Sequence, residues 1–151
     1  MTQELKLRLY KHCLDHVNHQ IDIINRALDD AQCAANDETK NSAGDKYETG
    51  RAMKQRESEL LVRRLNDAHA LQKTLHQIDI SKKCERVKPG ALVTTSMGIF
   101  FIAISADEVV VDNEEYCLVS QESPIGAAML NSRPGASFKF RDSVVKITAV
   151  E

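Results

Sequence analysis

Two carboxylates, Asp45 and Glu48, stand three residues apart in a polar segment between two long helical patterns. Residues at this spacing share one face of a helix, so both acids can act at one point. Acids at the tip of a narrow rod can carry negative charge into a space that a globular body cannot enter. The same acids could instead complement the dipole and the free amide groups of a helix start. The residues alone leave both interpretations open.

The rod is predicted from the spacing of apolar residues in the first part of the chain. One set recurs every seven residues, and a second set follows the first four of its members by three. These residues are Leu7, Leu14, Ile21, Leu28 and Ala35, then Tyr10, Val17, Ile24 and Ala31. Apolar residues at these two heptad positions over four heptads indicate the seam of a coiled coil.

A polar, turn-forming stretch then interrupts the pattern from Asn36 to Gly44. We expect a second helix to begin between Asp45 and Gly50, with a drift in register near Arg64. Its apolar positions are Met53, Leu60, Leu61, Leu65, Ala68, Leu71, Leu75 and Ile78. A short turn makes two such helices antiparallel neighbours. Thirty residues in each would give a hairpin about 45–50 Å long at about 1.5 Å per residue.

The second half of the chain has a different pattern, with short β-like runs separated by turn residues. The runs are Ala91–Thr95, Ile99–Ile104, Val109–Val111, Tyr116–Val119, Ser137–Phe140 and Val144–Val150. A short helix is predicted from Ser123 to Leu130, with Ser123 as N-cap and Pro124 at the first helical position. The predicted fold class is α+β: an N-terminal antiparallel helical hairpin, then a small antiparallel sheet with one helix. The predicted domains are a hairpin at 1–80 with its acidic tip near 36–50, a linker at 81–90, and a β-rich domain at 91–151.

Composition excludes several classes of function. The 151 residues carry a net charge of -2, so the whole chain is not a polyanion binder. Residues 29–48 have six acids and two bases, whereas residues 51–73 have six bases and three acids. This separation predicts an acidic tip with a basic shaft behind it. No signal peptide and no apolar run of transmembrane length is found, so we expect a cytoplasmic protein with no membrane partner.

The cysteines and histidines do not suggest a metal or catalytic site of the chain's own. Cys13, Cys33, Cys84 and Cys117 lack the short spacings of zinc or redox motifs, and we expect reduced thiols. His12 and His16 are four residues apart, a spacing that could hold a metal, but no third ligand follows at a suitable position. We therefore expect surface histidines.

Two motifs resemble those of the bacterial Gre transcript-cleavage factors, in a divergent branch. The predicted tip reads Gly44-Asp45-x-x-Glu48, similar to the G-D-x-x-E pattern of that family. The predicted short helix reads Ser123-Pro124-Ile125-Gly126-Ala127-Ala128-Met129-Leu130 and is followed by Pro134-Gly135. It resembles the S-P-[IML]-[AG]-x-A-[LM] helix of the family. The layout matches over the whole chain, and the motifs cover some twenty residues.

This resemblance implies an FKBP-like C-terminal domain and a transcription elongation factor that binds bacterial RNA polymerase. The tip would enter the secondary channel and stimulate the polymerase's intrinsic cleavage of backtracked RNA at the nascent 3′ end. Asp45 and Glu48 would help to hold a second Mg²⁺ and a water there, because carboxylates and waters suit this ion. The chain would then be an accessory factor and not an enzyme. It would have no cofactor of its own, and we expect a monomer.

The resemblance also assigns two contact surfaces. Glu122, Ser123 and Pro124 would dock on the polymerase rim, with Glu122 in place of the usual Asp; they could equally form a plain helix cap. The basic shaft would touch RNA phosphates or the channel wall; it could equally be a solvated helix face with local pairs. Its residues are Arg51, Lys54, Arg56, Arg63 and Arg64. No aromatic residues alternate with these bases, which argues against base stacking.

One departure leaves alternatives open. Where the family usually has N-A-E-Y after the second acid, this chain has Thr49-Gly50-Arg51-Ala52. A non-cleaving regulator or inhibitor that occupies the same channel is therefore an alternative. A coiled-coil adaptor without a polymerase partner is another. A peptidyl-prolyl isomerase is a more distant one, because four Phe and three Tyr supply an aromatic pocket poorly.

Overall fold

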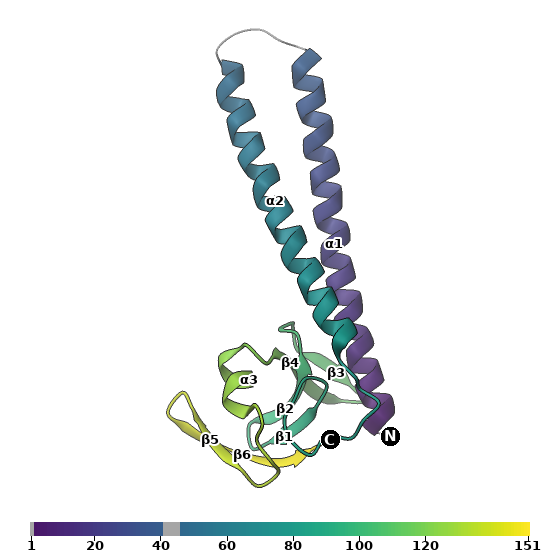
Figure 1. The fold of residues 1–151 in the computed structure, drawn as a ribbon, viewed down its shortest axis with the longest axis vertical. Coiled ribbons are helices and arrows are strands. Elements are labelled where there is room, and N and C mark those ends of the chain that lie inside the picture. The colour runs from purple at the N-terminus through teal and green to yellow at the C-terminus, as the bar shows by residue number, and fades with distance from the viewer. Residues whose placement is uncertain (1, 41–45) are drawn as a thin grey trace. The chain divides into compact units, whose positions relative to one another are not determined.

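The computed structural model describes the backbone of residues 2–40 and 46–151, and the side chains of residues 2–33 and 52–151. The described residues form two long helices, α1 (Thr2–Lys40) and α2 (Lys46–Gln77), and a short one, α3 (Pro124–Met129) (Figure 1). They also form six strands. These are β1 (Leu92–Thr95), β2 (Gly98–Ala103), β3 (Val109–Val111), β4 (Glu114–Ser120), β5 (Ser137–Phe140) and β6 (Ser143–Val150). The α+β class is therefore confirmed. None of the described helices combines the length and apolar character needed to cross a membrane.

The chain divides into two compact units. The hairpin unit is Val17–Gln72, and the sheet unit combines Met1–His16 with Lys73–Glu151. Both long helices therefore contribute residues to each unit. The predicted boundaries at residues 80 and 90 follow changes of composition instead, and they stay a prediction.

In the hairpin unit, α1 and α2 run antiparallel (Figure 1) along the predicted seam. Val17 and Ile21 are buried on α1, and Ile24 is half-buried. Ala68 is buried on α2, and the Gln72 amide donates a hydrogen bond of 2.9 Å to the Asn18 side chain. Repeated steps of three and four residues place these side chains on facing sides of the two helices. From Val17 onward, the heptad register is the one that the sequence predicts.

Before Val17 the prediction is wrong by one residue. Leu7 is 56% exposed, whereas Lys6, Leu9 and Cys13 are buried. This part of α1 belongs to the sheet unit, where the Tyr10 hydroxyl donates a 2.7 Å hydrogen bond to the Leu75 carbonyl. Packing within the sheet unit determines which face of α1 is buried here. The heptad pattern of the seam therefore does not extend to these residues.

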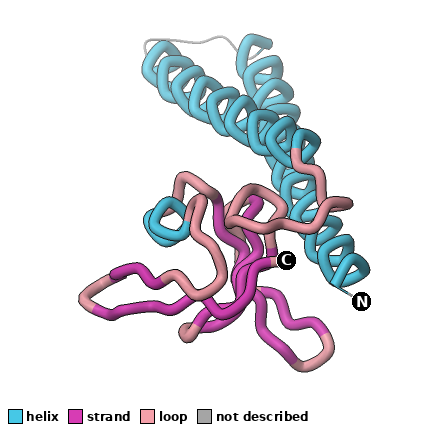
Figure 2. The backbone as a smooth tube through the Cα atoms, turned by 60° about the horizontal axis from the view of Figure 1, so that its bottom comes forward, coloured by secondary structure: helices cyan, strands magenta, loops and turns pink. Residues whose placement is uncertain are grey.

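The six strands form one sheet in the order β3-β4-β2-β1-β6-β5. Figure 2 shows the strands in magenta. Four neighbouring pairs are antiparallel, and β2 pairs with β4 in parallel, which the expectation of an antiparallel sheet did not include. After β2 the chain crosses to the edge strand β3 and turns at Asp112 and Asn113 into β4. Both turn residues have positive φ, 52° and 69°, as a tight hairpin turn requires. The chain reverses once between β2 and β3 and again between β3 and β4. As a result, β4 runs in the same direction as β2, beside which it lies.

The core of the sheet unit includes residues from outside the strands. Phe100, Ile102 and Ile147 are buried on the strands, and Met129 is buried on α3. The segment between α2 and β1, predicted as a polar linker, adds Cys84 and Val87 to this core, and both are buried. The stretch is polar in composition, yet two apolar side chains hold it against the sheet.

Candidate functional site

The predicted tip acids fall at the junction of α1 and α2 in the sequence. Asp45 lies outside the described residues, as does the side chain of Glu48. The backbone of Glu48 is helical, in the first turn of α2, which begins at Lys46. Acids at and just before a helix start face its free amide groups and the positive end of its dipole. The two roles considered for these acids, capping and metal positioning, both stay predictions.

Four of the five predicted basic contacts have described side chains, and these four occupy different sides of α2. Arg56 and Arg63 are seven residues apart, which is close to two turns, and both are exposed. Arg64 is exposed on the flank of the helix, whereas Lys54 is half-buried, in heptad register with Leu61 and Ala68 of the seam. The side chain of Arg51 lies outside those described. The described bases therefore do not form one continuous track.

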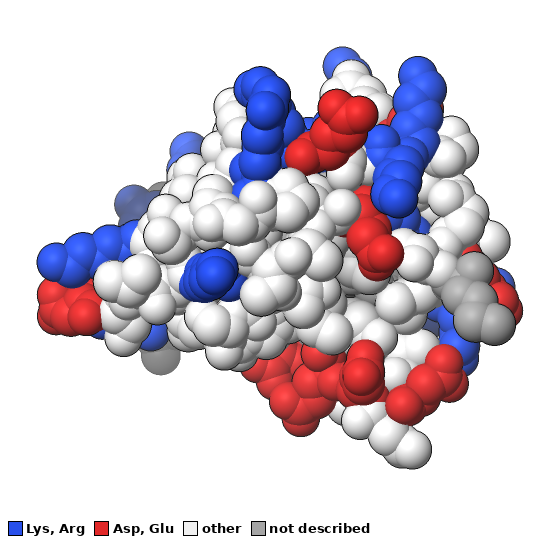
Figure 3. All heavy atoms as spheres, turned by 90° about the horizontal axis from the view of Figure 1, so that it is seen from below, with Lys and Arg blue, Asp and Glu red and all other residues white. Residues whose placement is uncertain are grey.

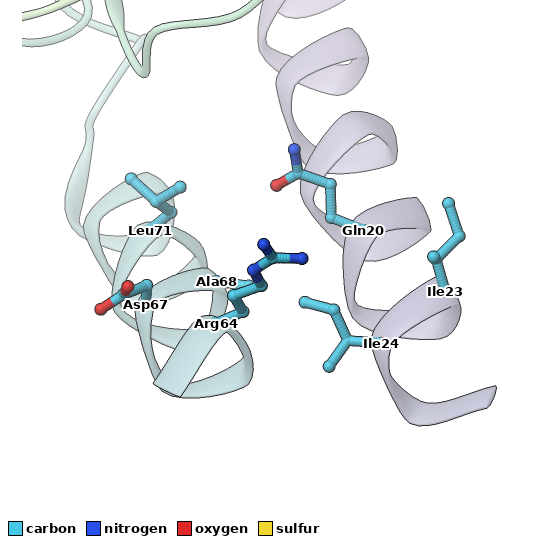
Figure 4. Close-up of a pocket in the computed structure, with 7 residues that line it drawn as sticks. All are labelled: Gln20, Ile23, Ile24, Arg64, Asp67, Ala68 and Leu71. Carbon is cyan, nitrogen blue, oxygen red and sulfur yellow. The ribbon is translucent and has the colours of Figure 1, made fainter. Parts of the chain in front are cut away.

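A hollow of about 320 Å³ opens on the hairpin unit, and Arg64 is the predicted base that lines it (Figure 4). Ile23 and Ile24 of α1 and Leu71 of α2 give it apolar walls, and Arg64 and Asp67 of α2 lie at it as well. Ile23 is 53% exposed, although it is a large apolar side chain. The hollow contains a single acid and a single base, so it lacks the convergent polar groups of a catalytic pocket.

The predicted docking segment is built around Ser123, which caps α3. Its hydroxyl accepts a 3.1 Å hydrogen bond from the Gly126 amide and donates one of 2.7 Å to the Ser120 carbonyl. The helix therefore begins as the sequence predicts, with Pro124 in its first turn. Glu122 and Pro124 are exposed beside this fixed serine. The cap is confirmed, and docking on a partner stays a prediction.

Gly126 has a structural role that the motif alone did not reveal. A Cβ atom placed on it would lie 1.9 Å from the carbonyl oxygen of Ser120. Real carbon–oxygen contacts are far longer, so only glycine lets α3 approach the end of β4 this closely. The small residue at this position fixes how Glu122 and Pro124 are presented.

The sulfur and imidazole groups give no metal centre in the described part of the chain. No three His, Cys, Asp or Glu side chains among the described residues are close enough to hold an ion. His12 is exposed and His16 is partly exposed, as expected for surface residues. All four cysteines are free thiols. Burial raises the pKa of the Cys13 thiol to about 11, so this cysteine is a poor nucleophile at neutral pH.

Sequence reasoning missed a buried cation in the sheet unit. Lys6 is 2% exposed, and its Nζ lies 3.8 Å from the Sγ of Cys84, which is also buried. Lysine is rarely buried to this extent. The only sequence signal was the spacing of Lys6, Leu9 and Cys13 along one helix face, and the heptad pattern placed its neighbours there instead.

No family model and no curated protein matches the chain. Among solved structures, one that it resembles is "Structure of the transcription factor Gfh1", with 17% sequence identity and a TM-score of 0.36. The likeness covers 91% of this chain and 92% of that one. We draw no conclusion about function from a likeness of this size.

Proposed function

We propose that this chain is a Gre-like transcription factor that binds bacterial RNA polymerase and places its hairpin tip in the secondary channel. There it would stimulate the polymerase's intrinsic cleavage of backtracked RNA. The observation that carries the proposal is the position of Gly44-Asp45-x-x-Glu48, which spans the start of the second of two antiparallel helices. Within the hairpin unit, α2 alone runs from Lys46 to Gln72, roughly 40 Å at 1.5 Å per residue. An arm of this length can reach a buried active site.

In this proposal Asp45 and Glu48 complete a site that the polymerase provides. A bound Mg²⁺ would supply charge neutralisation at the scissile phosphate and a more acidic water. The two carboxylates are hard oxygen ligands of the kind that this ion prefers, and the backbone of Glu48 lies in the first turn of α2. The chain acts as an accessory factor, and the nascent RNA 3′ end is the substrate of the polymerase.

In this proposal, the loop at Glu122, Ser123 and Pro124 in the sheet unit binds the polymerase. Glu122 and Pro124 are exposed at a loop that Ser123 and Gly126 hold in place, which suits a preformed contact on the polymerase rim. Among the bases, Arg56 and Arg63 are exposed on one side of α2 and are the best placed to touch the channel wall or RNA phosphates. Arg51, Lys54 and Arg64 would then make separate contacts.

A second candidate is a regulator that occupies the channel without stimulating cleavage. Thr49-Gly50 favours it, because glycine within the first turns of α2 weakens the helix that presents the acids. Such a protein would compete for the channel and inhibit or modulate initiation. The two candidates share the partner and differ in what the tip does.

The test adds the purified chain to a stalled, backtracked elongation complex with labelled RNA. The proposal expects short cleavage products, and it expects Glu122→Lys to weaken polymerase binding. Glu115→Lys is the matched control, because Glu115 is an exposed acid on β4, away from the docking loop. Binding without cleavage would support the regulator instead. No binding at all would reject both candidates and favour an adaptor.

A further inference from the structure

The sheet carries opposite charges at its two edges. Residues 106–122, which contain β3 and β4, hold six acids and no base, whereas residues 131–148, which contain β5 and most of β6, hold four bases and one acid. The strand order places β3 at one edge and β5 at the other. Figure 3 shows acidic side chains gathered along the lower edge of the face seen from below. A chain with a net charge of -2 therefore concentrates positive charge at one end of its sheet.

The four bases at this edge of the sheet have no acidic partner among the described residues. They are Arg133, Lys139, Arg141 and Lys146, and all four are exposed. Other bases of the sheet unit form ion pairs. A guanidinium nitrogen of Arg8 lies 3.2 Å from a carboxylate oxygen of Asp112, and the Nζ of Lys82 lies 3.9 Å from one of Asp79. The side chains of the four bases form no ion pair or hydrogen bond with any other described residue. Their charge is available to a partner.

The hairpin of β5 and β6, which we call the basic ribbon (Ser137–Lys146), places two lysines on one face. Lys139 is opposite Val144, and Ser137 is opposite Lys146, so the two lysines are diagonal neighbours. Diagonal pairs on antiparallel strands are about 7–8 Å apart, similar to the spacing of successive phosphates in an extended nucleic-acid strand. Val144, between them, is 73% exposed and offers an apolar surface.

The turn of the ribbon carries an arginine, Arg141, whose guanidinium lies over an aromatic ring. Arg141 and Asp142 both have positive φ, 47° and 64°, which gives the tight turn that joins the strands. The guanidinium carbon of Arg141 lies 5.3 Å from the centre of the Phe140 ring. The guanidinium therefore lies over the ring in a cation–π contact, and its planar surface away from the ring can receive a nucleobase. An acidic protein segment would use the charges but not this flat surface.

We propose that the basic ribbon binds single-stranded nucleic acid. Lys139 and Lys146 contact neighbouring phosphates, and Arg141 stacks on a base next to them. The acidic edge at β3 and β4 repels the strand and so directs it to the ribbon. This site shares no residue with the predicted hairpin tip or the docking loop, and it does not depend on the proposed function.

The test measures binding of a fluorescein-labelled 12-nucleotide single-stranded RNA by anisotropy between 50 and 200 mM salt. Together with the positive charge of Arg141, the two lysine contacts neutralise about three phosphates, which gives a slope of about -2 in log affinity against log salt and so roughly a 20-fold loss over this range. In the double variant Lys139→Gln, Lys146→Gln, binding should be weaker at 50 mM salt, and raising the salt to 200 mM should reduce the affinity only about threefold. The matched control is Lys11→Gln with Lys73→Gln, which removes two exposed bases from α1 and α2 and should leave binding unchanged.

Arg141→Lys tests the stack, because it keeps the charge and removes the planar group. We expect it to weaken binding about fivefold or more with the salt slope unchanged. Circular dichroism and thermal unfolding of each variant establish that the fold is kept. Three results would overturn the proposal: no RNA binding by the unaltered chain at 50 mM salt, equal losses in the ribbon and control pairs, or competition by polyglutamate as strong as by RNA at equal charge. The last would assign the ribbon to an acidic protein.

Discussion

The sheet unit and the hairpin unit differ sharply in how much apolar surface they bury. Among the residues whose side chains the structure describes, 23 apolar ones are buried, and all but Val17, Ile21 and Ala68 belong to the sheet unit. The hairpin unit leaves Ile23, Met53, Leu60 and Val62 between 45% and 62% exposed. One unit has a packed core, and the other has a single narrow seam.

The difference indicates how stability and function are divided. A seam two side chains wide holds two antiparallel helices side by side but adds little free energy per residue. The sheet unit has the packing that lets it hold Ser123, Gly126 and the basic ribbon in fixed geometry. Regions with few buried contacts open most readily, and functional segments are often drawn from them. The predicted tip acids belong to the sparsely packed unit, and the predicted docking loop belongs to the packed one.

The largest expected effect comes from the sheet core. Phe101 is fully buried, so Phe101→Ala should lower the free energy of unfolding by about 3–5 kcal/mol. Ile24 on the seam is half-buried, so Ile24→Ala should cost roughly 1–2 kcal/mol, below the range for fully buried residues. Both changes would be made in a Tyr47→Phe background, so that the remaining tyrosines, Tyr10 and Tyr116, are both in the sheet unit. Urea unfolding would then be followed by tyrosine fluorescence and by helical circular dichroism.

In this pair of variants each residue is the control for the other. The tyrosine signal should shift strongly only with Phe101→Ala. If Ile24→Ala cost as much as Phe101→Ala, the hairpin seam would be a true core, and the contrast between the units would be wrong.

A somewhat smaller effect is expected from Cys13, in the part of α1 that belongs to the sheet unit. Burial raises its pKa from 9.0 to about 11. Between these values the unfolded chain loses the thiol proton and the folded chain keeps it, so stability falls as pH rises from 9 to 11. The loss should reach about 2 kcal/mol at pH 11. Unfolding of Cys13→Ala over the same pH range should lack this component; parallel curves would show that Cys13 is accessible to solvent.

A further effect, of similar or smaller size, is expected at Gly126. Gly126→Ala forces α3 away from the Ser120 carbonyl and should cost about 1–3 kcal/mol, as overpacking does. Ala127→Ser is the control, because it adds one atom at an exposed position of the same helix. Equal stability of the two variants would mean that α3 can shift freely, and the docking loop would then have no fixed geometry.

Local patterns predicted much of this fold. The bounds of Val109–Val111 and Ser137–Phe140 are those predicted, and the other strands differ by one or two residues. The cap at Ser123 was also predicted, because capping depends on residues close in sequence. The seam from Val17 onward follows from a repeat that two facing helices must satisfy.

Features set by distant contacts could not be predicted in the same way. The exposure of Leu7 and the burial of Lys6 depend on what packs against α1, and Cys84 and Val87 are buried because the sheet lies beneath them. The parallel pair of β2 and β4 depends on strand order, which a strand pattern does not contain. The ribbon had a visible signal, the alternation Phe138-Lys139-Phe140-Arg141, but its meaning depended on the sheet edge at which it lies.

The central claim is that Asp45 and Glu48 act as metal-positioning acids in the polymerase. It is tested most directly by one cleavage measurement on backtracked complexes with the double variant Asp45→Asn, Glu48→Gln, at polymerase-saturating concentration. Amides keep the shape of the acids but are poor Mg²⁺ ligands, so cleavage should fall by at least about 100-fold while polymerase affinity is unchanged. If the acids only cap α2, the change costs at most about 1–2 kcal/mol of hairpin stability, and cleavage survives in proportion to folded protein. Full cleavage by the folded double variant would contradict the account.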